Sequence, residues 1–508
     1  MLESGLTPLA PVLISMLGAA ITKIAASFRP PRERDALALL MAGGAFVSAL
    51  LLAYQPASHV VISPWHSLTF FESQLAYTTE GLAAPFALLI SLVCSAVVLS
   101  LSKWRRESDD DSESSLYPAI FVVSAAGLSF IYSANLITLC LSWAFLDLSL
   151  LFLVVGPGRN QAASGAWGRA LMMSSLTGLS LVVAALLLNG HGLSPALVPS
   201  LLLVAALVRA SFYPMHFWML AGAEMEPPAN TLLQIIPIAA GLSLLPRLQE
   251  FSPQGLPYQS QLVTISSLAL LATALSAWAE QDRRRAISYI ALNQVALAVL
   301  SVAAVGPQAK SFLLWSAISL ALCLSLLNLR PPESERVGRY GLWLRVAVGL
   351  AIASLMGLPF TMGFVGRTVL YRSLFALGQP YLWGLSAVAD AVLFAALFRI
   401  GADLLSDLAN RTASSEWATW VPHLAGVILL TAPLVLLGIH PPLANFADMD
   451  LPAVAELIGR ADIALWAALL LPLVGGYLLH RGQKAVLERS AAFWKGLGAL
   501  LRLDWLYR

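Results

Sequence analysis

A small set of ionisable residues stands inside long apolar segments of this sequence. Its members are Asp147, Arg209, His216, Arg367 and Asp390. Because an ionised side chain is costly in a hydrocarbon environment, each member is a candidate for ion binding or proton transfer. Further polar candidates are Glu224 and Glu226, in a turn before Pro227, and the neutral residues Gln234, Asn293 and Gln294.

Both arginines lie near predicted interruptions of helices. Segment 341–377, which contains Arg367, is too long for a single span and includes Gly357, Pro359 and Gly363. Free carbonyl groups at such a break can stabilise a cation, and breaks line cavities rather than face lipid. Two interpretations stay open for each arginine: an ion path across the membrane midplane, or an ion pair that locks helices together.

Asp390 is the favoured partner of Arg367. His216 is more typical of a core or interfacial histidine than of a proton relay.

The elements that must position these residues are membrane-spanning helices. The chain has 508 residues, of which 58% are hydrophobic and 11% charged, and its mean hydropathy is +0.77. Soluble domains carry about 25% charged residues, so lipid is the expected solvent. The sequence predicts an all-α polytopic membrane protein with about 14–15 spans of the length that crosses a bilayer. These are 6–27, 35–54, 81–102, 117–133, 135–156, 167–189, 196–219, 228–246, 261–280, 285–304, 311–329, 341–377, 381–402, 421–439 and 461–480.

The distribution of basic residues predicts the orientation. With the N-terminus outside, 24 of the 30 Lys and Arg residues fall on the cytoplasmic side and four outside. This asymmetry obeys the positive-inside rule and places the C-terminus in the cytoplasm. Residues 104–116 form a charged loop, and residues 483–503 have the pattern of an amphipathic helix on the inner membrane face or on a neighbouring subunit.

Signatures of soluble enzymes and nucleic-acid-binding proteins are missing from the sequence. There is no phosphate-binding glycine-rich loop, no serine–histidine–aspartate set on a soluble domain, no metal-ligand spacing and no basic stripe with interleaved aromatic residues. Cys94, Cys140 and Cys323 lie within apolar runs, as small buried residues do. We therefore expect no catalytic residue, cofactor or metal in this chain, and the energy for any transport has to come from a partner.

Four segments resemble a known family, in the family's order. They are residues 79–90 (TEGLAAPFALLI), residues 208–220 (VRASFYPMHFWML) followed by 224–234 (EMEPPANTLLQ), residues 283–295 (RRRAISYIALNQV) and residues 357–370 (GLPFTMGFVGRTVL). The final LDWLYR is similar to the tail of one branch. The family comprises the antiporter-like, proton-translocating membrane subunits of respiratory complex I, membrane-bound hydrogenases and multisubunit sodium/proton antiporters.

The resemblance implies a fold with two inverted repeats of five helices, each containing one broken helix. In this chain the repeats are expected at 117–246 and 261–402. Helices 1–3 and an acidic loop precede them in residues 1–116, and C-terminal helices with an amphipathic tail follow in residues 421–508.

The chain departs from the family at the residues of the proton path. The family's fifth-helix glutamate is missing, since Trp143 is followed by Ala144, and the nearest carboxylate is Asp147, one helical turn later. The family's basic positions on helices seven, eight, eleven and twelve correspond to Arg209, Gln234, Cys323 and Arg367.

These departures change the chemistry. A desolvated lysine can release its proton, whereas arginine stays protonated in proteins. Arg209 and Arg367 would therefore supply fixed charge without titrating.

The resemblance implies a membrane subunit of a larger ion-translocating complex, in a bacterial or archaeal cytoplasmic membrane, with other membrane subunits as partners. Its modified path would use Asp147, Arg209, bound water and Arg367. Two alternatives stay open. One is a non-conducting scaffold paralogue beside redox or transport subunits. The other is the membrane half of an inorganic-carbon (bicarbonate or CO2) uptake system with a zinc-containing soluble partner.

Overall fold

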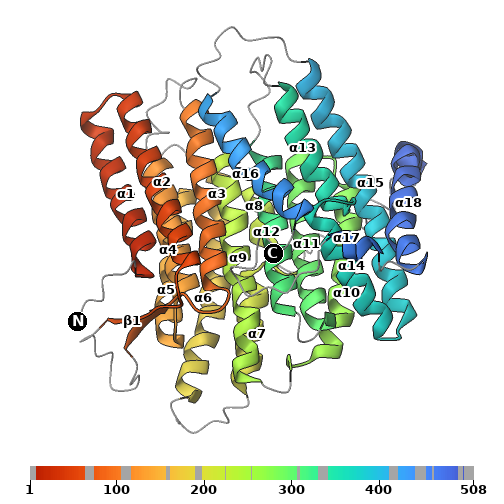
Figure 1. Cartoon of the computed structure of the whole chain (residues 1–508), viewed down its shortest axis with the longest axis horizontal. Coiled ribbons are helices and arrows are strands. Elements are labelled where there is room, and N and C mark those ends of the chain that lie inside the picture. Colours follow the sequence, from red (N-terminus) through yellow and green to blue (C-terminus); the bar gives the residue numbers. More distant parts are fainter. Residues whose placement is uncertain are drawn as a thin grey trace. The chain divides into compact units, whose positions relative to one another are not determined.

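The computed structural model describes residues 7–62, 74–104, 116–155, 161–188, 197–223, 225–252, 255–305, 309–329, 341–410, 421–440, 454–459 and 463–489, with positions 496 and 501. Helices dominate this part of the chain (Figure 1). The helices are α1 Leu9–Phe28, α2 Pro31–Tyr54, α3 Ala83–Trp104, α4 Leu116–Tyr132, α5 Leu136–Val155, α6 Gln161–Leu188, α7 Val198–Arg209, α8 Phe217–Gly222, α9 Pro227–Phe251, α10 Gln259–Ala279, α11 Arg283–Val305, α12 Ala309–Asn328, α13 Gly341–Met356, α14 Met362–Ala376, α15 Pro380–Asn410, α16 Val421–Ile439, α17 Val454–Gly459 and α18 Ile463–Arg489. The strands β1 His59–Ile62 and β2 Leu75–Thr78 form an antiparallel pair.

The helices match the predicted spans. Within the described residues, eleven helices are long and apolar enough to cross a membrane, and four shorter apolar helices accompany them. Each of the predicted segments contains one of these helices, so the prediction of an all-α polytopic membrane protein is confirmed. The physical reason is that helices satisfy their own backbone hydrogen bonds where water is missing.

The chain folds into two compact units. Unit 1 contains residues Met1–Ala210, Met225–Pro257 and Thr419–Gly426. In it α4 packs against α1, α3, α5 and α9, and nearly every side chain of α4 is buried. Gly241 of α9 lies against the backbone of Ala206 and Ala210, where any larger residue would overlap main-chain atoms. This close approach, typical of small residues in membrane helices, holds the end of α7 that carries Arg209.

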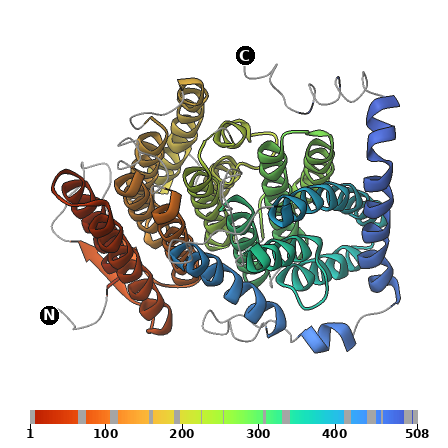
Figure 2. The ribbon, with the colours of Figure 1, turned by 90° about the horizontal axis from the view of Figure 1, so that it is seen from above.

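Unit 2 contains residues Ser211–Glu224, Tyr258–Ala418 and Val427–Arg508. Helices α10 and α11 pack together, and α15 packs against α10, α13 and α18. Figure 2 shows α18 along its length. The predicted amphipathic helix 483–503 begins within α18, and its residues beyond Arg489 lie outside the described residues except for positions 496 and 501.

Both repeats contain an interrupted helix, as expected. Helix α7 ends at Arg209, and α8 begins only at Phe217 after a turn in which Ser211 has a φ of 59°. Helix α13 ends at Met356, and α14 begins at Met362. The first break therefore falls inside the predicted span 196–219. Pro227 and Pro228 are the first two residues of α9. Proline is tolerated there because the N–H groups of the first helical turn have no carbonyl partner within the helix.

Candidate functional site: two buried arginine–aspartate pairs

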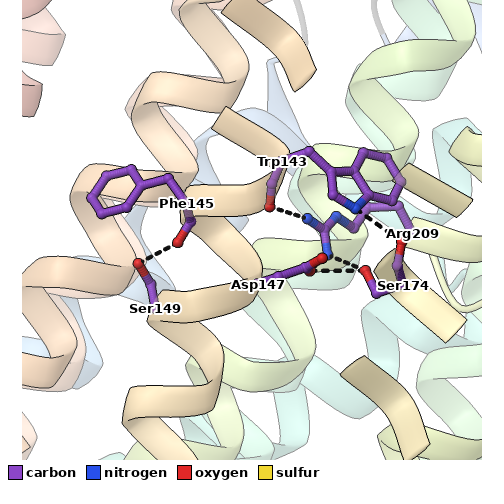
Figure 3. A network of polar contacts seen from close by, with 6 residues as sticks. All are labelled: Trp143, Phe145, Asp147, Ser149, Ser174 and Arg209. Atoms are coloured by element: carbon purple, nitrogen blue, oxygen red, sulfur yellow. Dashed lines mark hydrogen bonds and ion pairs between the residues drawn. The ribbon is translucent and has the colours of Figure 1, made fainter. Parts of the chain in front are cut away.

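In unit 1, Arg209 at the end of α7 forms a buried ion pair with Asp147 of α5 (Figure 3). Its Nη1 donates to Asp147 Oδ1 at 2.5 Å and to Ser174 Oγ of α6 at 3.0 Å. The Ser174 hydroxyl donates to the same Asp147 oxygen at 2.8 Å. Only 4% of the Arg209 side chain and 8% of the Asp147 side chain are exposed, so the two charges are compensated mainly by each other.

Trp143 completes the first pair from one turn earlier on α5. Its backbone carbonyl accepts a hydrogen bond from Arg209 Nη2 at 3.2 Å, and its indole ring lies under the guanidinium, 4.1 Å from the ring centroid to Cζ. Residues four apart share one helix face, so Trp143 and Asp147 reach Arg209 together. The indole N–H donates to the Ser174 carbonyl at 3.2 Å, and Gly178 leaves room for the ring.

In unit 2, Arg367 of α14 forms a second buried ion pair, with Asp390 Oδ2 of α15. The same carboxylate oxygen accepts a hydrogen bond from the Tyr371 hydroxyl at 2.9 Å. Nη2 of Arg367 donates to the Leu355 carbonyl at 2.8 Å, and the guanidinium lies 4.9 Å from the centroid of the Phe394 ring. This is the pairing expected from the sequence.

The break between α13 and α14 supplies the carbonyl that Arg367 uses. Leu355 lies in the last turn of α13, where carbonyl groups lack a partner within the helix. Gly357 follows with a φ of 72°, and a side chain at this position would overlap Arg367. Glycine is therefore required twice over, by its backbone conformation and by the packing of the arginine.

The two pairs have the same composition. In each, the guanidinium contacts an aspartate and a main-chain carbonyl and lies near an aromatic ring, while a hydroxyl binds the carboxylate oxygen that the arginine contacts. Each site can therefore stabilise one negative charge beside the guanidinium group of its arginine. Among the described residues, no three His, Cys, Asp or Glu side chains gather as metal ligands.

The structure places the other predicted residues on other segments. His216 is buried in the turn between α7 and α8, with Nδ1 at 2.9 Å from the Pro214 carbonyl and its ring stacked on Tyr213. Gln234 is buried in α9, and Cys323 is buried in α12 beside Ser319 and Ser354. Glu224 lies outside the described residues.

Sequence reasoning missed the hydroxyl partners of both pairs. Tyr371 follows Arg367 by four residues, so the helical period could have identified it. Ser174 has no comparable signal, because it comes from a separate helix and only packing brings it to Asp147.

Comparison with known proteins identifies a family and several similar membrane subunits. A family model described as "NADH:quinone oxidoreductase/Mrp antiporter, TM" matches residues 133–393. NADH-quinone oxidoreductase subunit N 2 of Solidesulfovibrio magneticus is 28% identical over 402 residues, which are 72% of this chain and 82% of that relative. NADH-quinone oxidoreductase subunit N of Geotalea uraniireducens is 25% identical over 480 residues, 86% of this chain and 96% of that relative.

Two solved structures have a similar fold. A chain of the Mrp complex from Dietzia sp. DQ12-45-1b aligns with a TM-score of 0.75 and 20% identity, covering 98% of this chain and 59% of that one. A chain of the membrane-bound sulfane sulfur reductase, an archaeal respiratory membrane complex, aligns with a TM-score of 0.72 and 16% identity, covering 88% and 78%. The family match spans both buried pairs, and this multi-pass antiporter-like membrane subunit belongs to the NADH:quinone oxidoreductase/Mrp antiporter transmembrane family.

Proposed function

We propose that this chain translocates protons as a membrane subunit of a multisubunit bioenergetic complex, and that Asp147 and Asp390 are the groups that gain and lose the proton. The observation that carries the proposal is that both arginines at the family's lysine positions are paired with a buried aspartate. The fixed charge and the titrating group are thus separate side chains.

The chemistry follows from the protonation behaviour of the two residue types. Arginine keeps its proton, so a proton that crosses a pair has to be held by the aspartate or by water. Protonation of the aspartate removes its charge and leaves a buried guanidinium without compensation, which is unfavourable. Proton uptake at one pair therefore favours a change of local structure or charge that a neighbouring subunit can exploit.

The names of the relatives support the choice of partners. Those relatives are subunits of NADH-quinone oxidoreductases, and the similar solved chains belong to multisubunit membrane complexes. We propose other membrane subunits as partners, a bacterial or archaeal cytoplasmic membrane as the location, and an outside N-terminus with a cytoplasmic C-terminus.

A non-conducting scaffold is the second candidate, because two buried ion pairs can also lock helices together. Uptake of bicarbonate or another anion has less support. Both guanidiniums already contact a carboxylate, which an anion would have to displace.

Proton uptake by membrane vesicles that contain the native complex tests the proposal. Asp147→Asn and Asp390→Asn should each lower proton transport per assembled complex by about tenfold or more, as expected for the loss of a proton-transfer group. Asp407→Asn is the control, since Asp407 pairs with Arg283 at a partly exposed position. Unchanged transport in both aspartate variants would favour the scaffold.

Arg209→Lys tests the role of fixed charge. Lysine lacks the planar group that contacts Asp147, Ser174 and the Trp143 carbonyl together, so transport should fall. Faster transport with lysine would contradict the assignment of arginine as a charge that does not titrate.

A further inference from the structure

Each buried pair contains a hydroxyl group that shares one carboxylate oxygen with the arginine. Ser174 Oγ and Arg209 Nη1 both donate to Asp147 Oδ1, at 2.8 Å and 2.5 Å. Tyr371 donates to Asp390 Oδ2 at 2.9 Å, and Arg367 contacts that same oxygen. The two hydroxyls come from different residue types on different helices, so a local sequence motif does not explain the shared arrangement.

The contacts to each aspartate are concentrated on one of its two oxygens. Among the described residues, the hydroxyl and the arginine of each pair converge on a single oxygen, Oδ1 of Asp147 and Oδ2 of Asp390. Asp147 is contacted by one charged group, Arg209, and Asp390 by one charged group, Arg367, and one titratable group, Tyr371. The two oxygens of each carboxylate are therefore in unequal surroundings.

We infer that Ser174 and Tyr371 are positioning residues for proton transfer, each of which anchors one oxygen of its aspartate and leaves the opposite oxygen as the proton acceptor. This inference rests on the proposed function.

The physical basis is the number of donors on each oxygen. An oxygen that already accepts two hydrogen bonds, one of them from a cation, has little electron density left for a proton. The proton then binds the other oxygen, and the shared oxygen can keep its contacts with the arginine and the hydroxyl. Without the hydroxyl only the arginine holds the carboxylate in its orientation, and the charged form of the carboxylate has one stabilising bond fewer.

The experiment measures proton transport against pH in vesicles with the native complex that carries Ser174→Ala or Tyr371→Phe. We expect an approximately tenfold lower rate and a transport profile displaced by about one pH unit to higher pH, because removal of a hydrogen bond to the charged form favours the protonated form.

Two buried hydroxyls provide matched controls. Tyr132→Phe removes a tyrosine hydroxyl in α4, and Ser91→Ala removes a serine hydroxyl in α3; neither hydroxyl has a hydrogen-bond partner among the described residues. Both controls should keep the rate and the pH profile of the unmodified complex.

A threonine–valine comparison at position 174 separates positioning from packing. The two side chains have nearly the same volume and differ in the hydroxyl. The Ser174→Thr variant should have the pH profile of the unmodified complex, and the Ser174→Val variant should have the displaced profile. This comparison tests the role of the hydroxyl even if Ser174→Ala yields little folded protein.

The outcomes distinguish this inference from the proposed function. If Asp147→Asn and Asp390→Asn stop transport while Ser174→Val and Tyr371→Phe behave as their controls, the inference is wrong and the proposed function stands. If the aspartate variants transport normally, the proposed function fails and this inference fails with it.

Discussion

Arg209 and Asp147 carry opposite charges in a part of unit 1 where little of either side chain is exposed. A buried pair of this kind gains little net stability, because desolvation of both ions offsets their attraction. Removal of one partner is much more costly than removal of both. The same reasoning applies to Arg367 and Asp390. This asymmetry offers a way to separate a structural role of the pair from a role in transport.

Arg209→Leu alone should destabilise the protein by about 3–5 kcal/mol, since it leaves Asp147 buried without a counter-charge. The double variant Arg209→Leu, Asp147→Leu should recover most of that stability and still transport few protons. Thermal unfolding in detergent and proton uptake in vesicles measure the two effects. Wild-type transport by a stable double variant would mean that the pair only locks helices.

The second interrupted helix depends on close contact between its two halves, α13 and α14. At the second break, the Gly363 N–H at the start of α14 donates to Ser354 Oγ of α13 at 3.2 Å, and the Trp315 indole donates to the Met362 carbonyl at 3.0 Å. The α-carbon of Gly363 lies directly against the Ser354 carbonyl oxygen. The break thereby fixes where the Leu355 carbonyl meets Arg367.

Gly363→Ala should destabilise the protein by about 1–3 kcal/mol, the range for overpacking, because its methyl group would overlap a backbone oxygen. Gly349→Ala is the matched control in α13, where no atom lies within 4 Å of the added methyl group. That control should be neutral or more stable by up to about 1 kcal/mol. Equal unfolding temperatures for the two variants would contradict the packing argument.

Two arginines outside the buried pairs donate hydrogen bonds to main-chain carbonyl groups at the ends of other helices. Arg247 of α9 donates to the carbonyls of Ile131 and Ser133 at the end of α4, at 2.6 Å and 2.8 Å. Arg399 of α15 donates to the carbonyls of Ala277 and Glu280 at the end of α10, at 3.1 Å and 2.6 Å. In the repeats expected from the family resemblance, each arginine would link the fifth helix to the end of the first.

Arg247→Gln and Arg399→Gln should each cost about 1–3 kcal/mol, because the helix ends lose charge-assisted hydrogen bonds and a cation near the negative end of the helix dipole. Hydrogen exchange should accelerate in the last turns of α4 and α10, respectively. Arg29→Gln is the control, since its pair with Glu33 is exposed and such pairs contribute little. Exchange that accelerates elsewhere in the protein but not at these helix ends would count against the assignment.

At the scale of the whole molecule, the chain consists of two units that each contain one buried pair. In the proposed function, partner subunits supply the energy for proton transport against a gradient. The orientation of the chain in the membrane then decides the direction of that transport.

The proposed orientation predicts a labelling pattern. A single Ser112→Cys change in the charged loop 104–116 should react with a membrane-impermeant maleimide in inside-out vesicles and not in right-side-out vesicles. Gln55→Cys, between α2 and β1, should show the opposite pattern. The positive-inside rule is the physical reason. The reverse pattern at both positions would place the N-terminus in the cytoplasm.

Several features could be predicted from the sequence because they depend on neighbours along the chain. The spans follow from runs of apolar residues long enough to cross a bilayer, and the break in 341–377 follows from Gly357, Pro359 and Gly363. The sequence also predicted an interruption near Arg209. That this interruption lies between Arg209 and Phe217 is known only from the structure.

The sequence by itself determined the solvent, the helices and the types of charge, since hydropathy and side-chain chemistry are properties of residues and short segments. The sequence also favoured Asp390 as the partner of Arg367, whereas only the tertiary structure decided which hydroxyl and carbonyl groups complete the two pairs. Ser174 and Asp147 are separated along the chain by 27 positions. The carbonyls of Trp143 and Leu355 belong to the backbone, which every residue has, so the sequence does not indicate that they bind an arginine. Their role depends on helix packing in three dimensions, which sets the distances over which hydrogen bonds and ion pairs act.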